Sequence, residues 1–231
     1  MRTSKILSPE ANQDHPLCVP CLEGKSTRTY NKTPSPRANK VLALIHSDLC
    51  GPFPIRSISG SQYFITFIDD ASRYVWIYFL KTKAHEEVLR VFHEFKAQVE
   101  KATGHSITRF RCDNGKGEYD NKYFKGFLAR SGISYEPSAS HTQNQNGVSE
   151  WMMRSISEKT RSLLSDAWIS EGFWEEAARA AVYLRNRSPT KALPNHMTSY
   201  EALKSVKPSL NHLRRFGCKA YAVVHPNLRT K

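Results

Sequence analysis

Apolar residues in the first half of the chain form short runs bounded by Gly, Pro and Asp, which predicts β-strands rather than helices. One run ends at Gly51-Pro52. A second ends at the turn Asp70-Ala71-Ser72, after which a third begins. The β-branched and aromatic content of these runs favours strands. The predicted strands span residues 41–48, 62–69 and 73–80.

The spacing becomes helical after residue 84, because apolar side chains then recur every three or four positions. We expect helices over 84–102, 120–130, about 148–164 and about 170–186, with strands over 107–112 and 132–136 and a polar loop over 137–147. Together, these elements predict an α/β fold with a mixed five-stranded sheet flanked by helices. Their order is that of the ribonuclease H-like fold.

Charge is distributed unevenly along the 231 residues, whose formal net charge is +13. Residues 41–153 are nearly neutral, whereas 204–231 carry seven basic residues and no acidic one. We therefore divide the chain into a Ser-, Thr- and Pro-rich linker (1–40), a catalytic core (41–190) and a basic C-terminal extension (191–231). Basic flanks indicate a polyanionic partner, most often nucleic acid, although solubilising tails would look the same.

Composition argues against several classes of protein. No apolar stretch approaches the ~20 residues that cross a bilayer, and the N-terminus lacks the apolar region of a secretory signal. The five cysteines are odd in number and irregularly spaced, so a reducing compartment fits better than a disulfide scaffold. We expect neither a membrane protein nor a secreted one.

Three acidic residues stand out by their places in the predicted elements. Asp48 and Asp113 end two predicted strands, and Glu150 lies in the first turn of a helix after the polar loop. Because strand ends of an open α/β sheet meet at one edge, we expect the three carboxylates to meet there. Such a cluster repels itself unless it binds Mg²⁺ or Mn²⁺, which prefer oxygen ligands. Two such ions can promote phosphoryl transfer.

Each carboxylate also has an ordinary explanation when taken alone. An Asp at a strand end commonly serves a turn, and a Glu in the first turn of a helix complements the helix dipole. Asp69, Asp70 and Glu118 are predicted near the same sheet edge and could be mistaken for ligands. The order Asp69-Asp70 before Ala71-Ser72-Arg73 fits turn chemistry better.

Six motifs resemble copia-type retrotransposon integrases, in the order of that family and from about Cys18 to the C-terminus. The resemblance implies a ribonuclease H-like D,D,E core whose metal-binding triad falls on Asp48, Asp113 and Glu150. It also implies an activity that joins element cDNA 3′ ends to host DNA. The motifs are HSDLCGP (46–52), FIDDASRYVWIYFLKTK (67–83), RCDNGKGEY (111–119), GISYEPSASHTQNQNGVSE (132–150), FWEEAARAAVYLRNRSP (173–189) and LRRFGCKAY (213–221).

The resemblance further implies DNA as the partner, a homo-oligomer as the working state and the nucleus as the site of action, reached through a cytoplasmic particle. Candidate DNA contacts surround the acidic residues and the loop before Glu150, although a histidine in such a loop is often simply solvated. These candidates are Asn114, Lys116, His141, Gln145, Asn146, Arg154 and Lys159.

The leader carries a motif that resembles part of a zinc module. Cys18-Val19-Pro20-Cys21 resembles the second half of the family's N-terminal module, which uses two His and two Cys. Both thiolates of such a turn can reach one tetrahedral Zn²⁺. Only seventeen residues precede Cys18, so the histidine pair is missing, and His15 alone leaves the site one ligand short. We expect a truncated zinc-type leader.

Three positions depart from the family pattern. Trp151 stands where a basic residue usually follows the catalytic Glu, Met153 where a polar residue is usual, and Thr142-Gln143 where Thr-Pro is usual. Trp151 lies about 100° from Glu150 around a helix and is expected to face DNA or solvent. These changes leave open a catalytically inactive or repurposed nucleic-acid-binding remnant. A ribonuclease H proper and a structural role in particle assembly are two further hypotheses.

Overall fold

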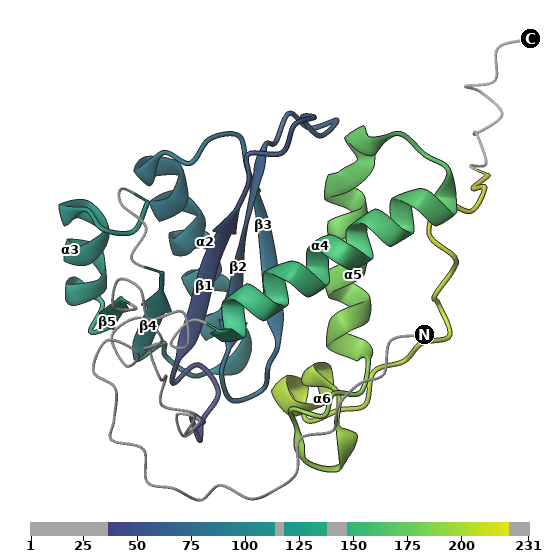
Figure 1. Cartoon of the computed structure of the whole chain (residues 1–231). Coiled ribbons are helices and arrows are strands. Elements are labelled where there is room, and N and C mark those ends of the chain that lie inside the picture. The colour runs from purple at the N-terminus through teal and green to yellow at the C-terminus, as the bar shows by residue number, and fades with distance from the viewer. Residues whose placement is uncertain (1–36, 114–117, 138–146, 222–231) are drawn as a thin grey trace, which may run out of the picture. The chain divides into compact units, whose positions relative to one another are not determined.

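A five-stranded sheet of order β3-β2-β1-β4-β5 forms the centre of the computed structural model, which describes residues 37–113, 118–137 and 147–221 (Figure 1). The first three strands pair antiparallel, whereas β1 runs parallel to β4, and β4 to β5. The predicted mixed sheet is therefore confirmed. The strands are β1 (Ile45–Cys50), β2 (Tyr63–Asp69), β3 (Val75–Leu80), β4 (Arg109–Cys112) and β5 (Ser134–Pro137).

Helices cover both faces of the sheet (Figure 1). Side chains of β2 alternate between the two faces of the sheet, and both faces are apolar. Ile65 and Phe67 lie in one core, and Phe64 and Ile68 lie in the other, so each face needs a layer of helices to cover it. The first core is closed by α2 (His85–Thr103) and α3 (Lys122–Arg130), and the second by α4 (Gly147–Ala167) and α5 (Trp174–Arg187). The short elements η2 (Glu171–Phe173), η3 (Pro194–His196) and α6 (Ser199–Lys204) follow the later helices.

The apolar faces of α2 and α5 are buried, whereas Tyr123 of α3, expected on the inner face of that helix, is 56% exposed. On α2, the five residues at helical spacing, from Val88 to Val99, all lie in the first core. On α5, Trp174 is buried with its ring centroid 4.4 Å from that of Phe53. Met153 of α4 joins the same core, which explains an apolar side chain at this position. The face of α5 that carries Trp174 and three alanines (Ala177, Ala178 and Ala181) is buried in the core.

The first strand begins later than predicted and runs further. Leu42 has a φ of 62°, and its N–H donates to Asp69 Oδ1 at 2.8 Å, so residues 41–44 form a turn. Because β1 extends to Cys50, Asp48 lies inside this strand and not at its end.

Asp69 and Asp70 have the structural roles that the turn pattern predicts. Asp69 accepts hydrogen bonds from the Ser72 N–H at 2.8 Å and from Ser72 Oγ at 2.6 Å. Asp70 contacts Arg73 at 2.8 Å. In the register of β1 and β2, Ile45 faces Asp69 and Asp48 faces Thr66. The expectation that this acidic pair lies near the edge occupied by Asp48 is therefore wrong.

Candidate catalytic site

Asp48 and Asp113 come to neighbouring positions because β1 and β4 run parallel. Ser47 of β1 pairs with Cys112 of β4. The next residue along each chain segment, Asp48 and Asp113, therefore lies beside the other, and neighbouring strands are ~4.8 Å apart. Ser47 and Cys112 face the α2–α3 core, where Ser47 Oγ lies 2.8 Å from the Tyr119 hydroxyl. Alternation along the strands therefore turns Asp48 and Asp113 toward the opposite face, where α4 packs.

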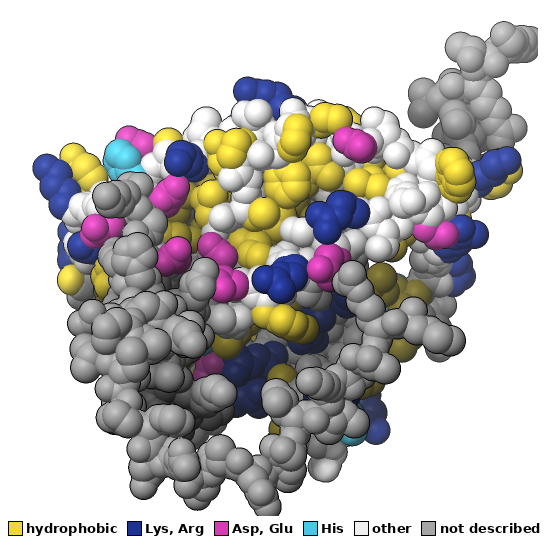
Figure 2. All heavy atoms as spheres, viewed as in Figure 1, with side chains coloured by type: hydrophobic (Ala, Val, Ile, Leu, Met, Phe, Trp, Pro, Cys, Tyr) yellow, Lys and Arg dark blue, Asp and Glu magenta, His cyan; other side chains and the backbone are white. Residues whose placement is uncertain are grey.

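Glu150 approaches the same place from the first turn of α4, which packs against β1 and β2. Met152, Met153 and Ile156 are buried between this helix and the sheet, which fixes the rotation of the helix about its axis. Glu150 is left exposed on another face of α4. Figure 2 shows acidic side chains gathered near the beginning of this helix.

The electrostatics of Asp48 link the three acids. Burial raises the pKa of Asp48 to about 6, although a hydrogen bond from the Leu49 N–H to Oδ1, at 2.8 Å, favours the ionised form. The negative charges of Asp113 and Glu150 raise this pKa further. Asp113 and Glu150 therefore both lie within electrostatic reach of Asp48, and a divalent cation would relieve the repulsion.

The chemistry of this donor set fits Mg²⁺ or Mn²⁺. All three side chains offer carboxylate oxygens, and Asp113 and Glu150 are exposed, so an ion bound there could keep water molecules as further ligands. Across the described residues, no group of three His, Cys, Asp or Glu side chains is close enough to hold a metal ion. The structure thus brings the predicted residues to one edge without forming a closed coordination shell.

The loop that leaves β1 beside Asp48 depends on a glycine. Gly51 has a φ of 132°, and a Cβ at this position would lie 2.6 Å from Tyr63 Cδ1. A larger residue would clash with the ring and strain the backbone. Gly51 therefore lets the chain turn tightly against β2 immediately after the strand that carries Asp48.

The predicted DNA contacts fall partly within the described structure. Arg154 and Lys159 are exposed on α4, and Trp151 is 56% exposed, as expected of a residue facing solvent. The remaining candidates, and both candidate zinc ligands, lie outside the described residues: Asn114, Lys116, His141, Gln145, Asn146, Cys18 and Cys21.

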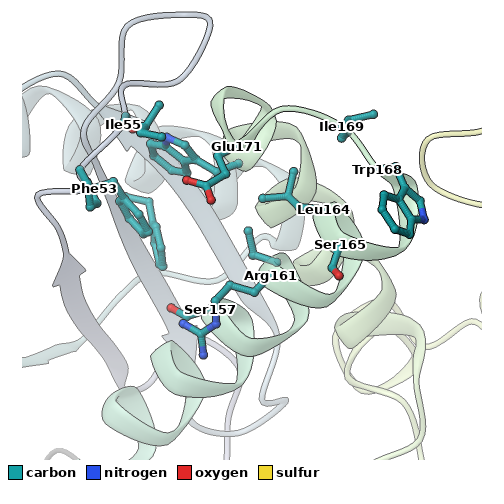
Figure 3. Close-up of a pocket in the computed structure, with 13 residues that line it drawn as sticks. Phe53, Ile55, Ser157, Arg161, Leu164, Ser165, Trp168, Ile169 and Glu171 are labelled. Atoms are coloured by element: carbon teal, nitrogen blue, oxygen red, sulfur yellow. The ribbon is translucent and has the colours of Figure 1, made fainter.

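An apolar hollow of about 790 Å³ lies further along α4, and none of the three carboxylates lines it (Figure 3). Phe53 and Ile55 of the loop after β1 line one side, and Leu164 of α4 and Trp174 of α5 line others. Its charged lining residues are Arg161 and Glu171. This hollow lacks a group of acids and bases suited to chemistry on phosphate.

Comparisons with known proteins agree with the geometry. Residues 38–143 match the family model described as integrase core domain. A chain in the cryoEM structure of the simian T-cell lymphotropic virus intasome in complex with PP2A regulatory subunit B56 gamma has a TM-score of 0.64 with this fold. It is 13% identical, and the match covers 93% of this chain and 69% of that chain. The sheet, its helices and these matches define a ribonuclease H-like integrase core.

Curated relatives narrow the family. The chain is 44% identical over 214 residues to the retrovirus-related Pol polyprotein from transposon TNT 1-94 of Nicotiana tabacum. This match covers 93% of the chain and 16% of the relative. It is 35% identical over 225 residues to that from transposon RE2 of Arabidopsis thaliana, covering 96% of this chain and 15% of the relative. The chain belongs to the copia-type retrotransposon integrase family.

In the described part, no helix is both long enough and apolar enough to span a bilayer.

Proposed function

We propose that this chain is the catalytic core of an integrase that joins DNA 3′ ends to target DNA by metal-dependent polynucleotidyl transfer. Asp48, Asp113 and Glu150 are its metal ligands. It acts as a homo-oligomer on element ends and target DNA, in the nucleus, after passage through a cytoplasmic particle. The observation that carries the proposal is the parallel pairing of β1 with β4, which sets Asp48 beside Asp113, together with the packing of α4 on β1, which brings Glu150 to the same region.

The fold supports a defined role for each side chain in this reaction. In joining, a 3′-hydroxyl oxygen bonds to a target phosphorus, and the bond from that phosphorus to the target 3′-oxygen breaks. Divalent ions held by the carboxylates of Asp48, Asp113 and Glu150 would supply charge that activates the hydroxyl and stabilises the leaving oxygen. Asp48 is oriented by the Leu49 N–H. Arg154 and Lys159 hold DNA phosphates and position the strand, largely without regard to sequence.

A strand-transfer assay with the full chain tests the proposal. A labelled duplex with a recessed 3′ end is incubated with target DNA and Mn²⁺ or Mg²⁺, and joined products are separated by size. We expect joining by the natural sequence and none by Asp113→Asn with unchanged circular dichroism. Asp120→Asn is the matched control, since Asp120 is an exposed Asp paired with Lys125 outside the proposed ligand set.

The outcomes separate the proposal from the rival functions. Joining that persists in Asp113→Asn would place the metal site elsewhere. Salt-sensitive DNA binding without joining, even in Trp151→Arg, would indicate an inactive nucleic-acid-binding remnant. Cleavage of the RNA strand of an RNA–DNA hybrid, without joining, would indicate a ribonuclease H.

A further inference from the structure

A second hollow, of about 620 Å³, lies along the first half of α4, against the end of α5 and the segment that follows it. Gly147, Trp151, Ser155 and Lys159 line it from α4. None of the three carboxylates lines this hollow, although Gly147 lies one helical turn before Glu150. This hollow, called here the basic pocket, is therefore separate from the three carboxylates.

Basic side chains dominate the lining of the basic pocket. Arg73, Lys159, Arg185 and Lys191 line it, and none of the described acidic side chains does. Arg73 pairs with Asp70, but the other three have no carboxylate partner in the part of the chain that the structure describes. Figure 2 shows basic side chains in a recess below α4. The pocket thus concentrates uncompensated positive charge.

Arg185 is the most constrained of these cations. It is 6% exposed, and its contacts are a weak hydrogen bond of 3.5 Å to Thr190 Oγ1 and the Trp151 ring at 5.8 Å. Burial lowers the pKa of Arg185, and the charge of Arg73 lowers it further. Lys159 is exposed, but partial burial and the charge of Arg185 likewise lower its pKa. Buried cations without an anion destabilise a fold until an anion compensates them.

The shape and rim of the pocket indicate which anion this is. Arg185, Lys159 and Lys191 line one space, and each can donate hydrogen bonds to phosphate oxygens. Trp151 lies in the lining and is 56% exposed as a residue, so a planar base could stack on its ring. Cations beside an exposed aromatic ring are typical of sites for single-stranded nucleic acid.

We propose that the basic pocket binds a backbone phosphate of a single nucleic acid strand, with a neighbouring base stacked on Trp151. The inference rests on the proposed function only in taking nucleic acid as the partner. It assigns a contact that lies away from the carboxylates and requires no divalent ion.

Binding is measured with the full chain in chelator, by fluorescence anisotropy of a labelled ten-nucleotide single strand across a salt series. We expect Arg185→Met to weaken binding on the order of tenfold, the loss of one charge-assisted hydrogen bond. Lys191→Gln, an exposed change that spares the fold, should reduce the salt slope by about one. Lys101→Gln, in the last turn of α2, is the matched control and should leave binding unchanged.

Stability distinguishes a ligand-binding Arg185 from a merely structural one. In chloride, Arg185→Met should unfold at higher urea concentration than the natural sequence, because a buried, repelled cation is removed. Inorganic phosphate at equal ionic strength should stabilise the natural sequence more than this variant. A lower midpoint for Arg185→Met, together with unchanged binding in Lys191→Gln, would overturn the proposal.

Two further probes identify other occupants. If polyglutamate binds the pocket as tightly as the DNA strand does, the partner is an acidic protein and the proposal fails. It also fails if inorganic phosphate stabilises the chain while single-stranded DNA does not bind. Because chelator prevents joining, none of these outcomes depends on whether the chain is an active integrase.

Discussion

Replacing Asp48 by Asn removes a negative charge that the fold holds at an energetic cost. The pKa of Asp48 is raised from 3.8 to about 6. That difference of about 2 units corresponds to about 3 kcal/mol at 1.36 kcal/mol per unit, and residual solvent access makes this an upper figure. Asn can still accept the hydrogen bond from Leu49. In chelator at pH 7.5, Asp48→Asn should therefore be more stable than the natural sequence by roughly 1–3 kcal/mol.

The pH dependence of this difference is the sharper test. Because the folded-state pKa lies above the unfolded one, the folded state binds the proton more tightly. The natural sequence thus loses stability as pH rises from about 4 to about 6. Urea unfolding of both proteins between pH 3.5 and 8 should give a difference near zero at the acidic end and a plateau above pH 6. A destabilised variant, or a difference independent of pH, would refute the reasoning.

Three other substitutions test how the sheet is held. Asp70→Asn should cost about 3–5 kcal/mol in urea unfolding at pH 7, because it leaves Arg73 without its carboxylate; a loss under 0.5 kcal/mol would contradict this. Trp174→Ala should cost about 3–5 kcal/mol, and thermal unfolding would reveal it; an unchanged midpoint would mean that this ring does not close the second core. Asn186→Ala removes both side-chain hydrogen bonds to the Val75 backbone, at 2.9 and 2.8 Å, and should cost about 2–3 kcal/mol; hydrogen exchange at β3 that stays slow would argue against it.

Much of the fold could be predicted from local pattern, because apolar spacing changes from strand to helix where the structure does. The β1 boundary could not, since it depends on Asp69, 27 residues away, accepting the N–H of Leu42. The sequence does not show which surface the aromatic residue at the start of α5 contacts, and the packing of Trp174 on Phe53 and Phe64 places it in the core.

The candidate site divides in the same way. Asp48, Asp113 and Glu150 could be selected from motif and position. The ends of neighbouring strands in an open α/β sheet lie at one edge, so residues far apart in the sequence come close together there. Arg185 could not be recognised, since it lies in an ordinary basic last turn of α5. Its significance comes from burial beside Arg73 and Lys159, which depends on how α5 packs against α4.

The central claim is that Asp48, Asp113 and Glu150 act as one metal site. Titration of Mn²⁺ into the full chain, followed by electron paramagnetic resonance, tests it without requiring DNA. Asp48→Asn, Asp113→Asn and Glu150→Gln should each weaken Mn²⁺ binding at least tenfold, while Asp120→Asn should not. Undiminished binding in Glu150→Gln, with loss in the other two, would contradict the account.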